Sequence, residues 1–333
     1  MTSGLFRHED LWRFGALVAV WLGVAALLPI APFPVVWMTF WPPLASAALL
    51  LGGWYVYRFL RPDERIATTA LVAVQMGLFS LGMELFNYLG FGFRRPSIDA
   101  SLAAADEAIG FDWAGFVVWL HSVPGADALL TFAYGSSLLQ VIVVLLLLGM
   151  SGRRAELDRF SLAFIIGASV TTIFWISFPS YGVYAHRVAL GLPVPDGLAV
   201  TPGYARTLLD LAAGDFRPLR YSEMIGLIAF PSFHTVLAII TMYGAWRLRA
   251  VGPLLVALNV VVLIAIPGDG GHYLVDLFGG ALVALFAIVA ARTVTGPAET
   301  GATRAAKLVM PSPPQLGRPL APQISTPPHR LPE

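Results

Sequence analysis

The chain has 333 residues, of which 57% are hydrophobic and 12% are charged, against about 25% charged residues in soluble domains. A soluble protein of this length needs a charged surface that this chain lacks, so we exclude a water-soluble globular protein. The formal net charge is +1, and without a clustered basic excess we expect no nucleic-acid partner. Cysteine is absent, which excludes disulfides, cysteine nucleophiles and zinc–cysteine sites.

Apolar stretches of about 18 residues or more predict membrane-spanning helices, and the chain has eight candidates, the seventh of them short. They run from Leu11 to Leu28, Pro43 to Leu60, Ile66 to Leu89, Ala128 to Met150, Phe160 to Phe178, Leu227 to Trp246, Pro253 to Pro267 and His272 to Ala291. We therefore predict an all-α fold, a polytopic membrane helix bundle of about eight transmembrane helices.

Arginine placement predicts the orientation, because cytoplasmic loops carry an excess of arginine and lysine. With eight spans, one side of the membrane receives both termini and three arginine-bearing loops. These residues are Arg7, Arg13, Arg58, Arg61, Arg65, Arg153, Arg154, Arg159, Arg247, Arg249, Arg292 and Arg304. We predict that this side is the cytoplasm. The sequence resembles that of a bacterial inner membrane protein in its compact loops.

Two stretches on the outer side of the membrane are not predicted to cross it. In residues 97–121, apolar residues recur at helical spacing with a break at Gly110–Asp112, which predicts two short interfacial helices. A loop folded over the bundle fits this pattern equally well. Residues 180–226 form a long extracytoplasmic loop, and loops of this length usually cover or build a site. Residues 294–333 are proline-rich and predict a disordered cytoplasmic tail.

The first block of candidate site residues lies at the outer end of the sixth predicted span. The sequence there is Phe230-Pro231-Ser232-Phe233-His234-Thr235. Proline is tolerated in a first helical turn, where its missing N–H would be unpaired. The free N–H groups of that turn, together with Ser232 Oγ, predict a cradle for an anion.

The second block lies at the outer end of the eighth predicted span, where Gly270 and Gly271 precede His272 and Tyr273. The glycines allow the backbone to approach a ligand closely. Because His272 and Asp276 are four residues apart, they share one helix face. A carboxylate there can hold the imidazole in one tautomer and make its other nitrogen a better nucleophile.

Both histidines are predicted at the same membrane depth, each beside a helix N-terminus. Ionisable residues in apolar spans are costly and usually functional, although either histidine alone could be a packing residue. We predict that His234 and His272 converge around one pocket large enough for a phosphate group. A separation well over a dozen ångströms would contradict this prediction.

The two blocks resemble motifs of the type 2 phosphatidic acid phosphatase superfamily, written PSGH and SRxxxxxHxxxD. This chain has Pro231-Ser232-Phe233-His234 and His272-x-x-x-Asp276. The phenylalanine and the His-Tyr-x-x-Asp form are most similar to the branch that contains inositol phosphorylceramide synthases and related inositolphosphotransferase-like enzymes. The resemblance implies a six-helix catalytic core at 63–293, with two extra transmembrane helices at 1–62.

The resemblance also implies the mechanism. His272 would attack phosphorus to form a phosphohistidine, Asp276 would orient it, and His234 would protonate the leaving alkoxide. Ser232, Phe233, Gly270, Gly271 and Tyr273 would line the substrate-binding site. The family chemistry needs no metal and no cofactor.

The family's phosphate-binding cations are incomplete here. Ala265 and Ile266 replace the Ser and Arg of the third motif. Arg217, which precedes Pro218, is the first candidate replacement, with Arg220 and Arg187 as alternatives, because a guanidinium suits bidentate phosphate contact. These arginines could equally meet lipid headgroups. Asp269, beside the cradle, has no assigned role.

We predict a metal-independent membrane lipid phosphatase or lipid phosphotransferase. Its partners would be a phosphorylated lipid and the surrounding membrane lipids, with water or an alcohol as acceptor. Two alternatives stay open. One is a catalytically degenerate lipid-binding or scaffold protein, suggested by the missing cations. The other is a proton-coupled transporter, which predicts ionisable residues scattered through several spans. The sequence does not indicate an oligomeric state.

Overall fold

The computed structural model describes residues 8–296, and helices account for most of them. The helices are α1 His8–Leu27, α2 Trp41–Tyr55, α3 Glu64–Gly90, α4 Asp99–Ala108, α5 Trp113–His121, α6 Ala126–Gly135, α7 Ser137–Met150, α8 Arg154–Ser177, α9 Gly182–Ala189, α10 Pro202–Ala213, α11 Phe233–Ala245, α12 Gly252–Asp269 and α13 Leu274–Thr295. The described part has one isolated β-bridge, Val35 with Leu219, and no strand. The predicted all-α fold is confirmed.

Every predicted span coincides with a helix, but fewer are long enough to cross a membrane. In residues 8–296, five helical segments are long and apolar enough to cross a membrane, and the number is six if the bent pair α5–α6 counts as one span. Helix α11 has 13 residues, which gives about 20 Å against a hydrocarbon core of roughly 30 Å. The predicted fourth span is interrupted at Ser136, between α6 and α7. The count of eight therefore remains a prediction.

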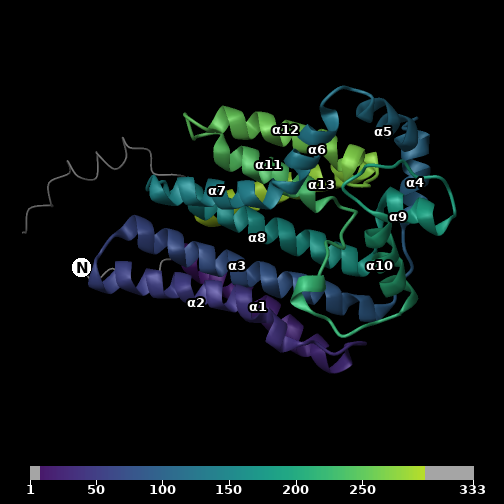
Figure 1. Cartoon of the computed structure of the whole chain (residues 1–333). Helices are drawn as coiled ribbons and strands as arrows, with labels where there is room; N and C mark the ends of the chain where they lie inside the picture. The colour runs from purple at the N-terminus through teal and green to yellow at the C-terminus, as the bar shows by residue number, and fades with distance from the viewer. Residues whose placement is uncertain (1–7, 297–333) are drawn as a thin grey trace, which may run out of the picture. The chain divides into compact units, whose positions relative to one another are not determined.

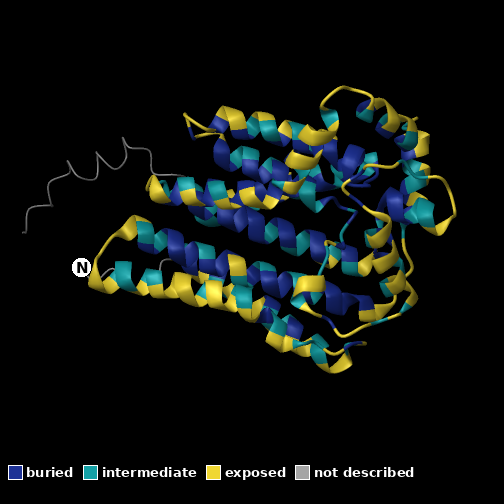
Figure 2. Cartoon of the chain, in the orientation of Figure 1, coloured by how far each residue is buried: buried dark blue, intermediate teal, exposed yellow. Residues whose placement is uncertain are grey.

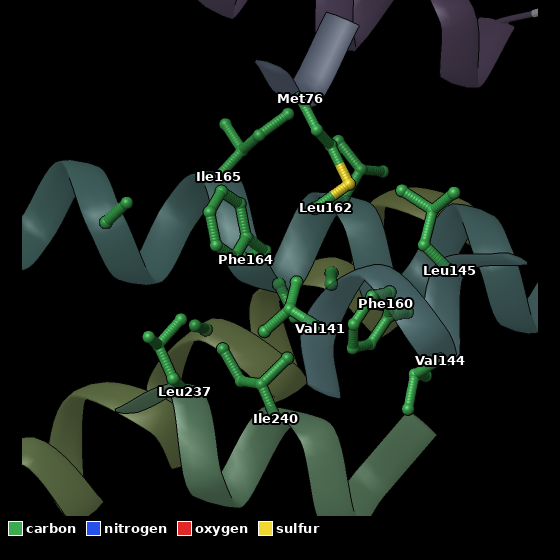
Figure 3. Close-up of a cluster of buried hydrophobic side chains, with 14 of the residues drawn as sticks. Met76, Val141, Val144, Leu145, Phe160, Leu162, Phe164, Ile165, Leu237 and Ile240 are labelled. Carbon is green, nitrogen blue, oxygen red and sulfur yellow. The ribbon is translucent and has the colours of Figure 1, made fainter. Parts of the chain in front are cut away.

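Helix α8 lies at the centre of the bundle and packs against α3, α7, α11 and α13. Figure 3 shows the main apolar cluster, where Phe160, Leu162 and Phe164 of α8 meet side chains of the neighbouring helices. Among those neighbours are Met76 of α3 and Leu237 of α11. This packing fixes α11 relative to the rest of the bundle.

The first two helices lie on the outside of α3. Helix α2 packs on α3 and has no buried residue, so its ribbon has the colours of exposed and intermediate residues in Figure 2. Helix α1 is tied to α8 by Arg13, whose fully buried guanidinium donates to Gln75 and pairs with Asp10 and Asp158. Arg154 pairs with the same two carboxylates, which balances the buried charges.

The short helices α4, α5, α9 and α10 gather at one end of the long helices (Figure 1). The two short helices predicted within 97–121 are present as α4 and α5, with the break at 109–112. The predicted loop 180–226 differs from expectation, because it contains α9 and α10. The predicted tail covers residues 294–333. Its first residues belong to helix α13, which ends at Thr295, and residues 297–333 lie outside the described residues.

Candidate active site

The structure brings the two motif histidines together at the end of the bundle that carries the short helices. His234 lies in the first turn of α11, and His272 lies in the connection between α12 and α13. Their ring centroids are 6.1 Å apart, with the ring planes at 76°. The separation is well within the limit set by the sequence prediction, so the two imidazoles can face one phosphate-sized group.

His272 is held by the carboxylate of Asp276. Its Nδ1 lies 3.1 Å from Asp276 Oδ2, which also accepts the backbone N–H of Tyr273 at 3.0 Å. Both side chains are buried. The carboxylate favours the tautomer with its proton on Nδ1, which leaves the lone pair on Nε2. Burial lowers the pKa of His272 to about 4. The ring is therefore neutral near pH 7, as a nucleophile must be.

His234 is stacked on Tyr134 of α6. Their ring centroids are 4.3 Å apart at an interplanar angle of 24°, and Tyr134 Oη lies 3.4 Å from His234 Nδ1. A Cβ at Gly270 would overlap the Tyr134 ring, so the close approach of α6 needs this glycine. Tyr134 is not predictable from the motifs, because it belongs to neither of them and lies 100 residues before His234.

The N-terminus of α11 retains the predicted donors. Ser232 is the N-cap, and its Oγ accepts the N–H of Thr235 at 3.2 Å. Among the described residues, no acceptor is bonded to the N–H groups of Phe233 and His234. Unbonded N–H groups at a helix N-terminus donate hydrogen bonds to a bound anion. Pro231 precedes the cap, so its predicted place inside the first turn is wrong.

The N-terminus of α13 differs from expectation. Its first two N–H groups, those of Leu274 and Val275, donate to Asp106 of α4 at 2.8 and 3.0 Å. The N–H of Tyr273 is bonded to Asp276. Because carboxylates already occupy these donors, this helix end is not available to a phosphate. Of the two helix N-termini that lie beside the histidines, that of α11 is thus the one whose N–H groups are unbonded among the described residues.

A direct backbone hydrogen bond joins the two motif blocks. The N–H of Ser232 donates to the carbonyl of Asp276 at 3.0 Å. A Cβ at Gly280 would lie 2.5 Å from the Ser232 carbonyl oxygen, so α13 needs glycine one turn after Asp276 to approach α11. This close packing sets the distance between the histidines.

The glycine loop before His272 is fixed by the segment between α8 and α10. Gly271 has φ +70°, and its carbonyl accepts the N–H of Tyr184 at 3.4 Å. Asp269 is fully buried and accepts the N–H of Ala199 at 2.6 Å and the Thr131 hydroxyl at 3.0 Å. Its structural role is to anchor the 190–201 segment.

The three candidate arginines are not brought to the histidines by any described hydrogen bond. Arg187 donates to the Pro193 carbonyl at 2.9 and 3.0 Å. Arg220 lies 3.8 Å from Glu223. Arg217 is exposed in the same segment, which is held against residues 33–40 through Leu219. The expectation that one of them stands in for the missing motif cations therefore has no support in this geometry.

Tyr273 and Phe233 belong to the packing around the site. Tyr273 is 1% exposed, and its hydroxyl has no partner among the described residues. Phe233 packs against Phe164 of α8, with ring centroids 6.2 Å apart. In residues 8–296, no three or more His, Cys, Asp or Glu residues form a group that could hold a metal ion.

A helical bundle with several membrane-spanning helices and a histidine pair at one end defines an integral membrane protein with a polar site. The sequence model of the PAP2 superfamily matches residues 100–290, more than half of the chain. The chain therefore belongs to the PAP2 superfamily, whose members are generally phosphatases or phosphotransferases. No curated protein and no solved structure matches the chain significantly.

Proposed function

We propose that the protein is a membrane lipid phosphatase or lipid phosphotransferase that works through a phosphohistidine. The observation that carries this proposal is the arrangement of three side chains. A carboxylate-held His272 and a second histidine lie 6.1 Å apart by ring centroids, next to the open N-terminus of α11. Phosphoryl transfer depends mainly on positioning and on charge stabilisation, and this arrangement supplies both.

In the first step, Nε2 of His272 attacks phosphorus and the bond from phosphorus to the leaving oxygen breaks. His234 donates a proton to that oxygen, so the leaving group departs as an alcohol. Asp276 stabilises the charge that develops on the His272 ring. In the second step, water or an alcohol attacks the phosphohistidine, His234 takes up its proton, and the N–P bond breaks. A proton transfer of this kind contributes typically ~10²–10⁴-fold in rate.

The N–H groups of Phe233 and His234 would bind the equatorial oxygens of the phosphoryl group. They are oriented before the substrate arrives, which avoids reorganisation during the reaction. Since the donors of α13 are occupied by Asp106, we place the phosphoryl group against α11.

The proposal also covers the kind of substrate and the side of the membrane on which the active site lies. The apolar helices around the site favour a phosphorylated lipid that enters from the bilayer. The arginine distribution favours an active site on the extracytoplasmic side, in a bacterial inner membrane. The Pro231–His234 block and the His-Tyr-x-x-Asp form are similar to those of inositol phosphorylceramide synthases, so headgroup transfer to an alcohol is proposed beside hydrolysis.

The test traps the intermediate. Purified full-length protein in lipid nanodiscs is incubated with ³²P-labelled phosphatidic acid and quenched in base. The wild type is expected to hold an acid-labile, base-stable label, and His272→Gln is expected to hold none. His186→Gln, on α9, is the matched control and keeps the label. Label that persists in His272→Gln would reject the assigned nucleophile, and a rate abolished by EDTA would reject a metal-independent reaction.

Product analysis separates the alternatives. Free phosphate indicates hydrolysis, whereas a labelled alcohol indicates transfer. If neither phosphatidic acid nor a phosphodiester lipid such as phosphatidylinositol yields label or product, the degenerate lipid-binding protein is favoured. A proton flux across proteoliposomes that needs His272 would favour the transporter.

A further inference from the structure

A small cavity lies where α3 and α8 end, outside the histidine site. Its volume is about 50 Å³, and both aromatic residues and arginines line it. The lining includes Phe91, Trp175 and Tyr181, together with Arg94 and Arg95. None of these residues has a role in the proposed reaction. The cavity is thus a separate feature of the same end of the bundle.

The two arginines bring positive charge to this cavity without a matching carboxylate. In the part of the chain that the structure describes, no acidic side chain is within ion-pair distance of Arg94 or Arg95. The nearby carboxylate of Asp99 is instead bonded to the N–H groups of Tyr181 and Gly182. Arg94 and Arg95 are neighbours in the chain and line the same cavity, so their positive charges repel each other and a bound anion would relieve that repulsion.

The backbone at Arg94 supports a ligand-binding role. Arg94 has φ +46° and is the one non-glycine residue with positive φ in residues 8–296. Such backbone strain tends to occur at functional sites. The guanidinium lies over the Phe216 ring at 5.9 Å and against Gly214, where a Cβ would overlap it. The side chain is thereby held in place.

The wall of the cavity also touches both histidine blocks. Ser180 lies between the lining residues Pro179 and Tyr181, and its Oγ accepts the N–H of Phe230, which precedes Pro231. Gly182, the next residue, packs against the Gly271 carbonyl, so closely that a Cβ would lie 2.6 Å from it. One short segment therefore separates a ligand in the cavity from the reacting histidines.

We infer that this cavity is an anion-binding subsite that takes a phosphate group. Two arginines supply positive charge for a phosphate group, and a guanidinium binds phosphate oxygens in a bidentate manner. The aromatic lining residues would pack against the apolar part of a lipid next to its phosphate. The phosphate could belong to a membrane lipid or be free inorganic phosphate. The subsite does not depend on the proposed reaction, because it uses none of its groups.

The test measures binding rather than turnover. The wild-type protein in detergent is titrated with inorganic phosphate by calorimetry, and in a second arm native mass spectrometry records retained phosphatidic acid. Arg95→Gln and Arg94→Gly are each expected to weaken binding about tenfold or more, since each removes a charge-assisted hydrogen bond to the anion. Glycine accepts the backbone at position 94 without strain, so the melting temperature of Arg94→Gly should not fall.

Two further variants complete the design. Arg206→Gln removes an exposed arginine of α10 and should bind as the wild type does, as should His272→Ala. Retention of lipid without phosphate binding assigns the subsite to a lipid headgroup, and equal binding of free phosphate assigns it to the small anion. The inference is overturned if neither arginine variant weakens binding, or if His272→Ala abolishes binding while Arg94→Gly does not. Loss of catalysis in His272→Ala tests the proposed function separately.

Discussion

A single buried histidine sets the conditions under which the proposed reaction can run. His272 is 4% exposed, and burial lowers its pKa to about 4, from an ordinary value of about 6.5. Asp276 orients the ring without leaving it protonated near neutrality. The same burial that removes water from the site thus keeps the nucleophile ready at pH values where an exposed histidine would be charged.

This burial predicts the acid limb of the pH–rate profile. The neutral ring is the reactive form of His272, so the acid limb that this residue sets should lie near pH 4. Burial and the neighbouring His272 also lower the pKa of His234, to about 3, so the protonated form that donates to the leaving oxygen becomes more populated as the pH falls toward this limb. Because the pKa of His272 is lower in the folded than in the unfolded protein, the contribution of this residue to the free energy of unfolding is complete above about pH 6.5. That contribution is lost as the pH falls toward 4. Initial rates in nanodiscs between pH 3.5 and 8 test this. A limb near 6.5 would show that the ring is solvated.

At the scale of elements, α4 holds two other helices by their N-termini. Asp106 accepts the N–H groups of Leu274 and Val275 at the start of α13, and Asp99 accepts those of Tyr181 and Gly182 at the start of α9. The two aspartates are seven residues apart, so they lie on the same face of α4. Only the Asp106 contact is on the helix that carries Asp276.

Substitutions of Asp106 and Asp99 can be compared directly, because both carboxylates bond the N-terminus of a helix. Asp106→Asn and Asp99→Asn each remove one charge from a helix N-terminus, and we expect each to cost about 1–2 kcal/mol of stability. We expect only Asp106→Asn to lower kcat, by about tenfold with KM unchanged, because it loosens the helix that carries Asp276. Thermal unfolding and steady-state rates check this. Equal kcat losses in the two variants would show that Asp106 acts through stability alone.

A second element-scale contact concerns the glycine face of α13. Gly280→Ala would place a Cβ 2.5 Å from the Ser232 carbonyl oxygen, and a backbone atom cannot move aside easily. We expect a loss of about 1–3 kcal/mol and a larger histidine separation, hence lower kcat. Gly77→Ala in α3 has nothing within 4 Å and should be neutral or stabilising by up to about 1 kcal/mol. Unfolding in detergent measures both. A stable, active Gly280→Ala would mean that the two helices are not held this closely.

At the scale of the whole described chain, local patterns and long-range contacts differ in what the sequence can reveal. Apolar stretches located the helices because each bilayer-length segment carries its own signal, and the pairing of His272 with Asp276 followed from helical spacing. The partners of the histidines did not follow. Tyr134 reaches His234 from another helix, and no pattern in its own segment marks it.

Charge compensation was the hardest feature to predict. The arginine beside a family-like proline, Arg217, is exposed in the segment held against residues 33–40. Asp106 lies in α4 and belongs to no motif, yet it bonds the first two N–H groups of α13, the helix that follows His272. Which donors are already bonded depends on tertiary contacts, and a sequence of residue types does not show them.

The orientation of the bundle gives a prediction for the whole molecule. Ser151 lies between α7 and α8, and Asp196 follows α9 beyond the far end of α8. Helix α8 has 24 residues, about 36 Å, which is enough to cross the hydrocarbon core. Since residues 153–159, at the start of α8, carry three arginines, we expect Ser151 in the cytoplasm and Asp196 outside.

The absence of cysteine makes this orientation directly measurable, because each introduced thiol is the only one in the protein. A membrane-impermeant maleimide should label Asp196→Cys in intact cells or spheroplasts, and Ser151→Cys only after lysis. The reversed pattern would place the histidine site on the cytoplasmic side and require a cytoplasmic substrate. Labelling of both positions from outside would show that α8 does not cross the membrane, and the span assignment would then have to change.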